Sequence, residues 1–214
     1  MKRHIILLND VNTEDDRPGV SFFSKDSVVS KIGQQQSLAI AKYLLDISLD
    51  MIVASTACSI SRLLHNLRQR GGKPLSTSTG SSVVMKSIPV YYSEELNDRD
   101  FGVLNGTIIP PESDIFKHSR VCAEGGESIE QCRLRSFSCV RSYLDKYPDK
   151  NIAFVSHQNV CQILFNVLSN QSITHFDELW KFKGTYADFE SNNISNTLTK
   201  FYNILHHLRF QGEE

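Results

Sequence analysis

The stretch Ile152-Ala153-Phe154-Val155-Ser156-His157 decides the fold class of this chain. Its apolar run is followed at once by a serine and a histidine, and residues 160–168 then carry apolar side chains at helical spacing. A short apolar run of this kind is typical of a strand buried on both faces of a parallel sheet, with a helix packed back against it. The pattern therefore places His157 where a buried strand meets the next helix.

The same succession of strand and helix recurs toward the N-terminus. Further strands are predicted at residues 5–8, 51–54 and 83–92, the last interrupted by Pro89. Further helices are predicted at residues 30–49, 61–70 and 128–147, with Glu127 and Ser128 as helix-start residues of the last one. This order predicts an α/β protein, a three-layer α/β/α sandwich with a mostly parallel central sheet.

No repeat or linker divides the chain, so we expect one domain over residues 1–214. Residues 73–82 are rich in Ser, Thr and Gly and are predicted to form a flexible surface insertion. The C-terminal segment, residues 195–214, is ambiguous. It carries an apolar stripe that fits a helix, but residues 199–205 fit a strand equally well. We expect either form to pack on the core, with a partner-binding helix as the alternative.

The composition excludes several classes of protein. The chain has 214 residues, of which 40% are hydrophobic and 22% charged, which is typical of a soluble globular protein and not of a disordered chain or a coiled-coil rod. Its formal net charge of -1 argues against general nucleic-acid binding. Its five cysteines form no Cys-x-x-Cys pair, so neither a disulfide framework nor a zinc site is expected. No apolar stretch suits a membrane span or a signal peptide, and we expect a cytoplasmic or nuclear protein.

Polar residues follow three of the predicted strands at their carboxyl ends, where ligands bind in open α/β sheets. These are Asn9-Asp10, Ser55-Thr56 and Ser156-His157. Asp98 lies in a loop that can reach the same edge. A histidine at the start of a helix can donate to a phosphate or a carboxylate, although His157 could equally be bonded to a neighbouring backbone carbonyl.

Four stretches, in order along the chain, resemble motifs of the histidine phosphatase superfamily, whose fold is also called phosphoglycerate mutase-like. They are residues 29–37, similar to a Leu-Thr-x-x-Gly-x-x-Gln-Ala helix start; residues 96–106, similar to an acid-bearing loop; Gly125-Gly126-Glu127-Ser128; and Val155-Ser156-His157. Each motif is weak alone, but four in order are fairly specific. The resemblance covers about residues 5–170.

The resemblance implies a phosphoryl-transfer site. In the family, a histidine at the end of the first strand attacks phosphorus and becomes phosphohistidine. Two arginines and a second histidine hold the phosphate oxygens, and a carboxylic acid protonates the leaving oxygen. Neither a metal nor another cofactor is expected. The ligands implied are a phosphorylated small molecule or a phosphoprotein. The charge balance and the short apolar runs described above argue against general nucleic-acid binding and against a membrane.

The sequence departs from the family where the chemistry begins. The motif Arg-His-Gly should follow the first strand, but Asn9 and Asp10 stand at the places of its arginine and its histidine. Without a gap the second arginine becomes Ile60, whereas a two-residue insertion would place Arg62 there, which we favour slightly. Asp98 replaces the usual glutamate, and His157 is retained.

Two functions from different classes therefore compete. The first is a degenerate, catalytically impaired family member that acts by binding a phosphorylated ligand or a protein partner. The second is an active phosphomonoesterase or phosphomutase in which Asp10 is the nucleophile or a divalent metal assists. The candidate catalytic residues are Asp10, Asp98 and His157, and the candidate phosphate-binding residues are Asn9, Arg62 and His157.

Overall fold

The computed structural model describes residues 3–14, 16, 28–46, 48–57, 64–65, 88–110, 112–174, 183–191 and 196–203. Ile60, Arg62 and the predicted insertion at 73–82 lie outside these residues, as do residues 204–214 of the C-terminal segment. Of the helix predicted at 61–70, only Leu64 and His65 are described, and both are helical.

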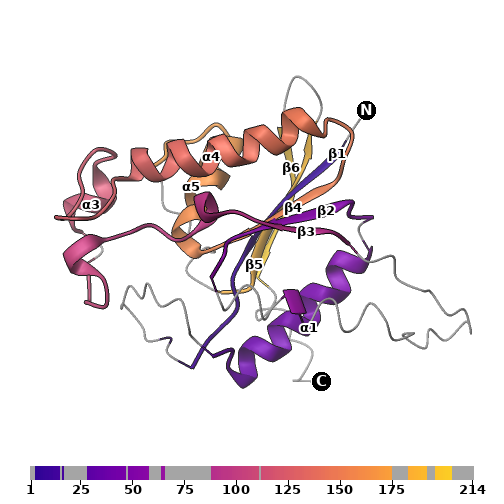
Figure 1. The fold of residues 1–214 in the computed structure, drawn as a ribbon, viewed down its shortest axis with the longest axis horizontal. Helices are drawn as coiled ribbons and strands as arrows, with labels where there is room; N and C mark the ends of the chain where they lie inside the picture. The colour runs from indigo at the N-terminus through magenta and orange to yellow at the C-terminus, as the bar shows by residue number, and fades with distance from the viewer. Residues whose placement is uncertain are drawn as a thin grey trace, which may run out of the picture.

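A six-stranded sheet runs through the centre of the fold in the order β3-β2-β4-β1-β5-β6 (Figure 1). The strands are β1 (Arg3–Asn9), β2 (Met51–Ala54), β3 (Val90–Tyr92), β4 (Ile152–Ser156), β5 (Thr185–Ser191) and β6 (Asn196–Asn203). Strands β1 to β4 are mutually parallel, whereas β5 runs antiparallel to β1 and to β6. The predicted, mostly parallel α/β sheet is thus confirmed.

Helices cover both faces of this sheet. Helix α1 (Lys31–Asp46) lies on one side, and α4 (Ile129–Lys146) and α5 (Gln158–Leu168) lie on the other (Figure 1). Shorter turns, η1 (Glu94–Leu96), η2 (Gly102–Leu104) and α3 (Asp114–Lys117), occupy the connection between β3 and α4. Among the described residues, no helix is long and apolar enough to cross a membrane.

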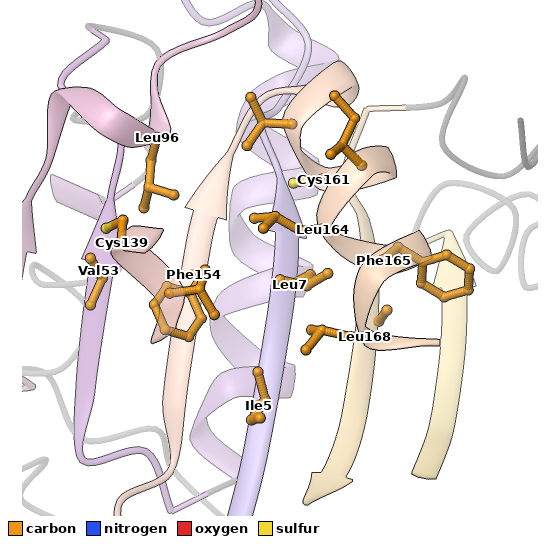
Figure 2. Packing of buried hydrophobic residues seen from close by; sticks show 14 of the residues in the cluster. Ile5, Leu7, Val53, Leu96, Cys139, Phe154, Cys161, Leu164, Phe165 and Leu168 are labelled. Atoms are coloured by element: carbon orange, nitrogen blue, oxygen red, sulfur yellow. The ribbon is translucent and has the colours of Figure 1, made fainter. Parts of the chain in front are cut away.

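The strand residues divide alternately between two cores because successive side chains point to opposite faces of a sheet. Ile5 and Leu7 belong to the cluster under α4 and α5, which includes Phe154, Cys161 and Leu164 (Figure 2). Their neighbours Ile6 and Leu8 belong to the cluster under α1. All four side chains of this strand are essentially fully buried, which explains why its sequence is a continuous apolar run.

Local sequence signals set where the helices begin. Ser128 is the N-cap of α4 and forms a capping box with Gln131, so its predicted role at the helix start is confirmed. Ser30 precedes α1, and its hydroxyl accepts a hydrogen bond of 3.0 Å from the N–H of Gly33. A Cβ atom at Gly33 would lie 2.0 Å from the backbone oxygen of Asn12, so only glycine lets this helix pack against the loop after β1.

Three elements differ from the sequence prediction. The described part of the C-terminal segment forms strand β6, so the helical interpretation is wrong for Asn196–Asn203 and the strand interpretation holds. Within the described part of the strand predicted at 83–92, β3 begins after Pro89, whose carbonyl still accepts from the N–H of Ile52 at 2.9 Å. Residues 83–87 lie outside the described residues. Strand β5 was not predicted, although it lies beside β1 and completes the edge at which the candidate residues gather.

Candidate functional site

Four segments meet at the carboxyl edge of the parallel strands. Asn9 is paired in register with Ser156, so the next residues, Asp10 and His157, leave neighbouring strands at the same level. Strand β5 is antiparallel, so its beginning reaches this edge, and the N–H of Gly184 donates to the backbone oxygen of Asp10 at 2.8 Å. This contact brings Lys183 to the end of β1.

Asp10 lies at the centre of the site. Its Oδ2 atom is 3.0 Å from Nζ of Lys183 and 3.4 Å from Nδ1 of His157, and its side chain is only 5% exposed. Burial acts to raise the pKa of Asp10, but the positive charges of Lys183 and His157 outweigh burial and hold the pKa below its usual value. Asp10 is therefore a buried, ionised carboxylate.

Both ring nitrogens of His157 have partners. Nε2 lies 3.1 Å from Oγ of Ser55, and the Ser55 hydroxyl itself donates to Oδ1 of Asn97 at 2.7 Å. Nε2 must therefore donate to Ser55 while Nδ1 faces the carboxylate of Asp10, an arrangement that needs a proton on each nitrogen. Burial acts to lower the pKa of His157, but its bond to Asp10 and the charges of Asp10 and Asp98 raise it above the usual value. We therefore treat His157 as a cation.

Lys183 joins two acids from the segment that follows β1. Its Nζ atom lies 3.0 Å from Oδ2 of Asp10 and 2.9 Å from Oδ1 of Asp16. Burial acts to lower the pKa of Lys183, but the two carboxylates raise it, so the ammonium stays charged. Asp10, Asp16, His157 and Lys183, called the charge cluster below, balance two negative charges against two positive ones.

Gln36 fixes the geometry of the charge cluster from helix α1. Its Nε2 donates to the backbone oxygen of Lys183 at 2.7 Å, and its Oε1 accepts from the N–H of Asn12 at 2.8 Å. The amide therefore ties the start of β5 to the loop after β1. Together with the close approach at Gly33, this bond gives the Gly-x-x-Gln pattern of residues 33–36 a physical role.

Asp98 stands beside the charge cluster. Its Oδ1 accepts from the N–H of Arg99 at 2.8 Å and from Nδ2 of Asn159, in the first turn of α5, at 3.2 Å. Its backbone oxygen accepts from Arg135 at 3.0 Å, and Arg135 also holds the carboxylate of Glu127. Asp98 is therefore attached both to the helix that begins after His157 and to an arginine of α4.

The structure places most of the predicted site residues together. Asp10 and His157 are in direct contact, Asp98 lies close enough to act on the pKa of His157, and Asn9 is fully buried at the end of β1. Arg62 and its alternative Ile60 lie outside the described residues. Among the described residues, no group of three His, Cys, Asp or Glu side chains could hold a metal ion.

Sequence reasoning missed Lys183. The signal was present but faint, because residues 185–189 carry the threonine and aromatic residues that favour strands, directly after Gly184. Recognising that strand, and pairing it antiparallel beside β1, would have brought Lys183 to the site.

The overall fold is shared with several solved protein structures. Solved structures with the same architecture include YhfR of Bacillus stearothermophilus, 16% identical, with a TM-score of 0.74 over 92% of this chain and 95% of that one. A mycobacterial glucosyl-3-phosphoglycerate phosphatase is 16% identical, with a TM-score of 0.73 over 95% and 100%. The alpha-ribazole phosphatase from Shigella flexneri is 20% identical, with a TM-score of 0.65 over 92% and 95%. These likenesses establish a phosphoglycerate mutase-like α/β fold.

The family follows from the sequence itself. Residues 75–202, more than half of the chain, match the sequence profile of the histidine phosphatase superfamily (branch 1). The chain therefore belongs to this family. The matched region contains Asp98, His157 and Lys183 and begins after β1 and β2, so Asn9 and Asp10 are not part of it. A search of curated proteins found no match.

Proposed function

We propose that this protein is a catalytically impaired histidine phosphatase that acts by binding a phosphorylated ligand. One observation carries the proposal. Asp10 stands where the family has its nucleophilic histidine, and its carboxylate forms ion pairs with both nearby cations, Lys183 and His157. The chain keeps the family's fold and its second histidine while the group expected to attack phosphorus is replaced by an acid.

The charge cluster is a poor place for phosphoryl transfer. The family chemistry needs positive charge around the phosphate oxygens, where negative charge grows in the transition state. Here Asp10 and Asp16 balance Lys183 and His157, and Asp98 adds a further acid nearby. A carboxylate about 4 Å from a singly charged phosphate oxygen costs about 4 kcal/mol at an effective dielectric constant of about 20. A bound phosphate can lower part of this cost by shifting its position away from the carboxylate. In phosphoryl transfer the negative charge on the phosphate oxygens grows, so the repulsion grows with it.

The phosphorylated ligand is proposed by analogy with the neighbours in fold. Two of them are named as phosphatases of phosphorylated small molecules, glucosyl-3-phosphoglycerate and alpha-ribazole-5'-P. A phosphoprotein would present the same chemical group. Recognition of a protein partner without any phosphate is the outcome that remains if no phosphorylated compound binds.

A second candidate is supported by the ionised state of Asp10. An ionised carboxylate can attack phosphorus and form an aspartyl phosphate, so the protein could be a phosphomonoesterase with altered chemistry. The low pKa of Asp10 favours this idea, but the ion pairs of its carboxylate with His157 and Lys183 oppose it, because they lower the nucleophilicity of the oxygen that would attack phosphorus. We therefore rank this candidate second.

Phosphate release by the purified protein separates the two candidates. A panel of phosphomonoesters is offered with and without magnesium, and the His157→Ala variant serves as the baseline. The proposal expects no release above that baseline in the wild-type protein. Release that is lost in both His157→Ala and Asp10→Asn would instead establish the second candidate.

A gain-of-function variant tests whether Asn9 and Asp10 are the residues that disable catalysis. The double substitution Asn9→Arg and Asp10→His rebuilds the family motif at the end of β1. If only these residues disable the site, this variant releases phosphate and forms an acid-labile phosphohistidine detectable with a labelled substrate. Circular dichroism and thermal unfolding show whether the variant is folded, and the wild-type result decides between the candidates by itself.

A further inference from the structure

We propose that the charge cluster selects oxyanions that carry a proton, such as hydrogen phosphate or a singly charged phosphomonoester, over fully ionised ones such as sulfate, and that Asp10 is the selecting residue. This inference rests on the proposed function, because it concerns the same phosphate ligand. It specifies the protonation state of the bound ligand and the residue that distinguishes this state from the fully ionised one.

The two carboxylate oxygens of Asp10 have different surroundings. Oδ2 faces Lys183 at 3.0 Å and His157 at 3.4 Å. Oδ1 is buried, and among the described residues no donor lies within hydrogen-bond distance of it. Buried polar atoms without a partner are rare and costly in folded proteins. A ligand hydroxyl that donates to Oδ1 would remove this cost, whereas an anion without a proton could only repel it.

The neighbours of Asp10 supply the attraction that an anion needs. The more exposed cation is Lys183, at 23%, followed by His157, at 13%, so the ligand oxygens meet these two side chains before they meet the acid. Helix α5 adds the positive end of its dipole, and its first N–H groups receive no cap from the side chain of His157. Positive groups therefore lie beside a carboxylate for which the described residues supply no donor to Oδ1.

Hydrogen phosphate fits this combination and sulfate does not. At about pH 8 both ions are tetrahedral dianions of similar size, but only phosphate still carries a proton to donate. The hydrogen bond to Oδ1 would form in a buried site and to a charged acceptor, where such bonds are strongest. Sulfate would place a lone pair against the same oxygen. Asp98, which is tied to α5 through Asn159, is a second acceptor that could take part in the same discrimination.

The test compares two ions of matched charge and shape. Inorganic phosphate and sulfate are titrated into the full-length protein at about pH 8 by isothermal calorimetry. We expect phosphate to bind about 10-fold to 100-fold more tightly than sulfate, which is the range for one hydrogen bond to a charged group. The Asp10→Asn variant keeps the shape of the side chain but loses the charge, and we expect it to bind sulfate at least as well as phosphate.

A matched control comes from the other end of the sheet. Asp188 is also a buried carboxylate beside a histidine, at 2.9 Å from Nδ1 of His4. The Asp188→Asn variant should retain the wild-type preference for phosphate. The Asp98→Asn variant then shows whether the second acid shares the selection.

A monoester distinguishes free phosphate from an esterified group. Methyl phosphate keeps a proton well below about pH 6 and loses it above, so a protein that takes esters should bind it at about pH 5 and much more weakly at about pH 8. A protein that prefers inorganic phosphate should discriminate against the ester at both values. Tighter binding of methyl phosphate at about pH 8, where it has lost its proton, than at about pH 5 would overturn the selection by Asp10.

The outcomes separate this inference from the proposed function. Equal affinity of the wild-type protein for phosphate and sulfate overturns the selection while leaving the proposed phosphate binding intact. A preference that persists unchanged in Asp10→Asn also overturns it. If neither ion and no ester binds, both proposals fail together. The wild-type ratio decides even if Asp10→Asn does not fold.

Discussion

Replacing Lys183 with methionine should destabilise the protein more than the loss of a surface lysine would. Lys183 holds Asp10 at 3.0 Å and Asp16 at 2.9 Å, and the Asp10 side chain is only 5% exposed. Removing one partner of a buried ion pair costs about 3 to 5 kcal/mol, because the other charge stays buried without compensation. His157 continues to face Asp10, so we expect the lower end of this range, about 3 kcal/mol.

A double-mutant cycle distinguishes the lost ion pair from lost packing. Asp10→Asn alone leaves Lys183 in contact with Asp16, and His157 can lose its proton once the carboxylate charge is gone, so we expect it to cost only about 1 kcal/mol. In the double variant the buried charge that Lys183 compensated is gone, so Lys183→Met should then cost much less than in the wild-type background. A coupling free energy of about 2 kcal/mol is expected from these differences.

Urea unfolding at about neutral pH measures each free energy, from the midpoint and slope of the transition. Lys150→Met is the matched control, because Lys150 also contacts a carboxylate, Asp50, at 2.9 Å, but the two side chains are 50% and 33% exposed. This exposed pair should contribute at most about 1 kcal/mol. The reasoning fails if Lys183→Met costs no more than Lys150→Met, or if Asp10→Asn does nothing to rescue it.

Four further predictions concern the charge cluster, the packing at Gly33 and the buried Arg99. The raised pKa of His157 contributes stability that is complete below its unfolded pKa of about 6.5 and is lost as the pH rises through its folded pKa. The free energy of unfolding, measured with urea at a series of pH values, should therefore fall above about pH 6.5. The Asp10→Asn variant should show a smaller fall. The lowered pKa of Asp10 acts in the opposite direction. Its contribution to stability is present above the unfolded pKa of about 3.9 and is lost as the pH falls through the folded pKa. This loss at acid pH should be absent in the Asp10→Asn variant. Gly33→Ala should cost at least about 2 kcal/mol in thermal or urea unfolding, because its Cβ would lie 2.0 Å from the backbone oxygen of Asn12, whereas Gln34→Ala, at an exposed position of the same helix, should be nearly neutral. Arg99→Met should increase hydrogen exchange across residues 115–127, because buried Arg99 donates to the backbone oxygens of Ile115, Val121 and Glu127; unchanged exchange there would contradict this role.

The parallel part of the sheet could be predicted because burial on both faces leaves a direct mark on the sequence. Residues 5–8, 51–54 and 152–156 are continuous or nearly continuous apolar runs, and each lies within a described strand. The helices α1, α4 and α5 could be predicted as well, from apolar residues at helical spacing and, for α4, from the start signal Ser128 and the stop signal Tyr147-Pro148. These elements follow from local patterns and need no knowledge of distant contacts.

The antiparallel edge of the sheet could not be predicted from such patterns. Strand β5 contains Asp188 and Glu190, and buried Asp188 has His4 of β1 as a partner at 2.9 Å. Its polar residues are therefore compensated by a neighbour that is 184 residues away in the sequence. The C-terminal segment was ambiguous for a similar reason, because its strand β6 pairs only with β5.

Only part of the candidate site could be predicted from the sequence, for the same physical reason. Asp10, Asp98 and His157 follow or precede elements that the sequence marks clearly, so they could be predicted to meet. Lys183 depends on β5, and its role as the partner of Asp10 becomes visible only in three dimensions. Arg62 and Ile60 lie outside the described residues, and the choice between them stays a prediction.

Asp10 and Lys183 form one interdependent pair of buried charges. A lone carboxylate in this buried position would be disfavoured, because burial acts to raise its pKa toward the neutral form. Lys183 reverses that effect and remains charged because Asp10 and Asp16 both face it. The buried carboxylate at the end of β1 therefore depends on a cation that lies just before β5, and Gln36 holds the backbone of that cation in position. Because each of these two side chains keeps the other charged, losing either one should weaken the phosphate binding that we propose for this site.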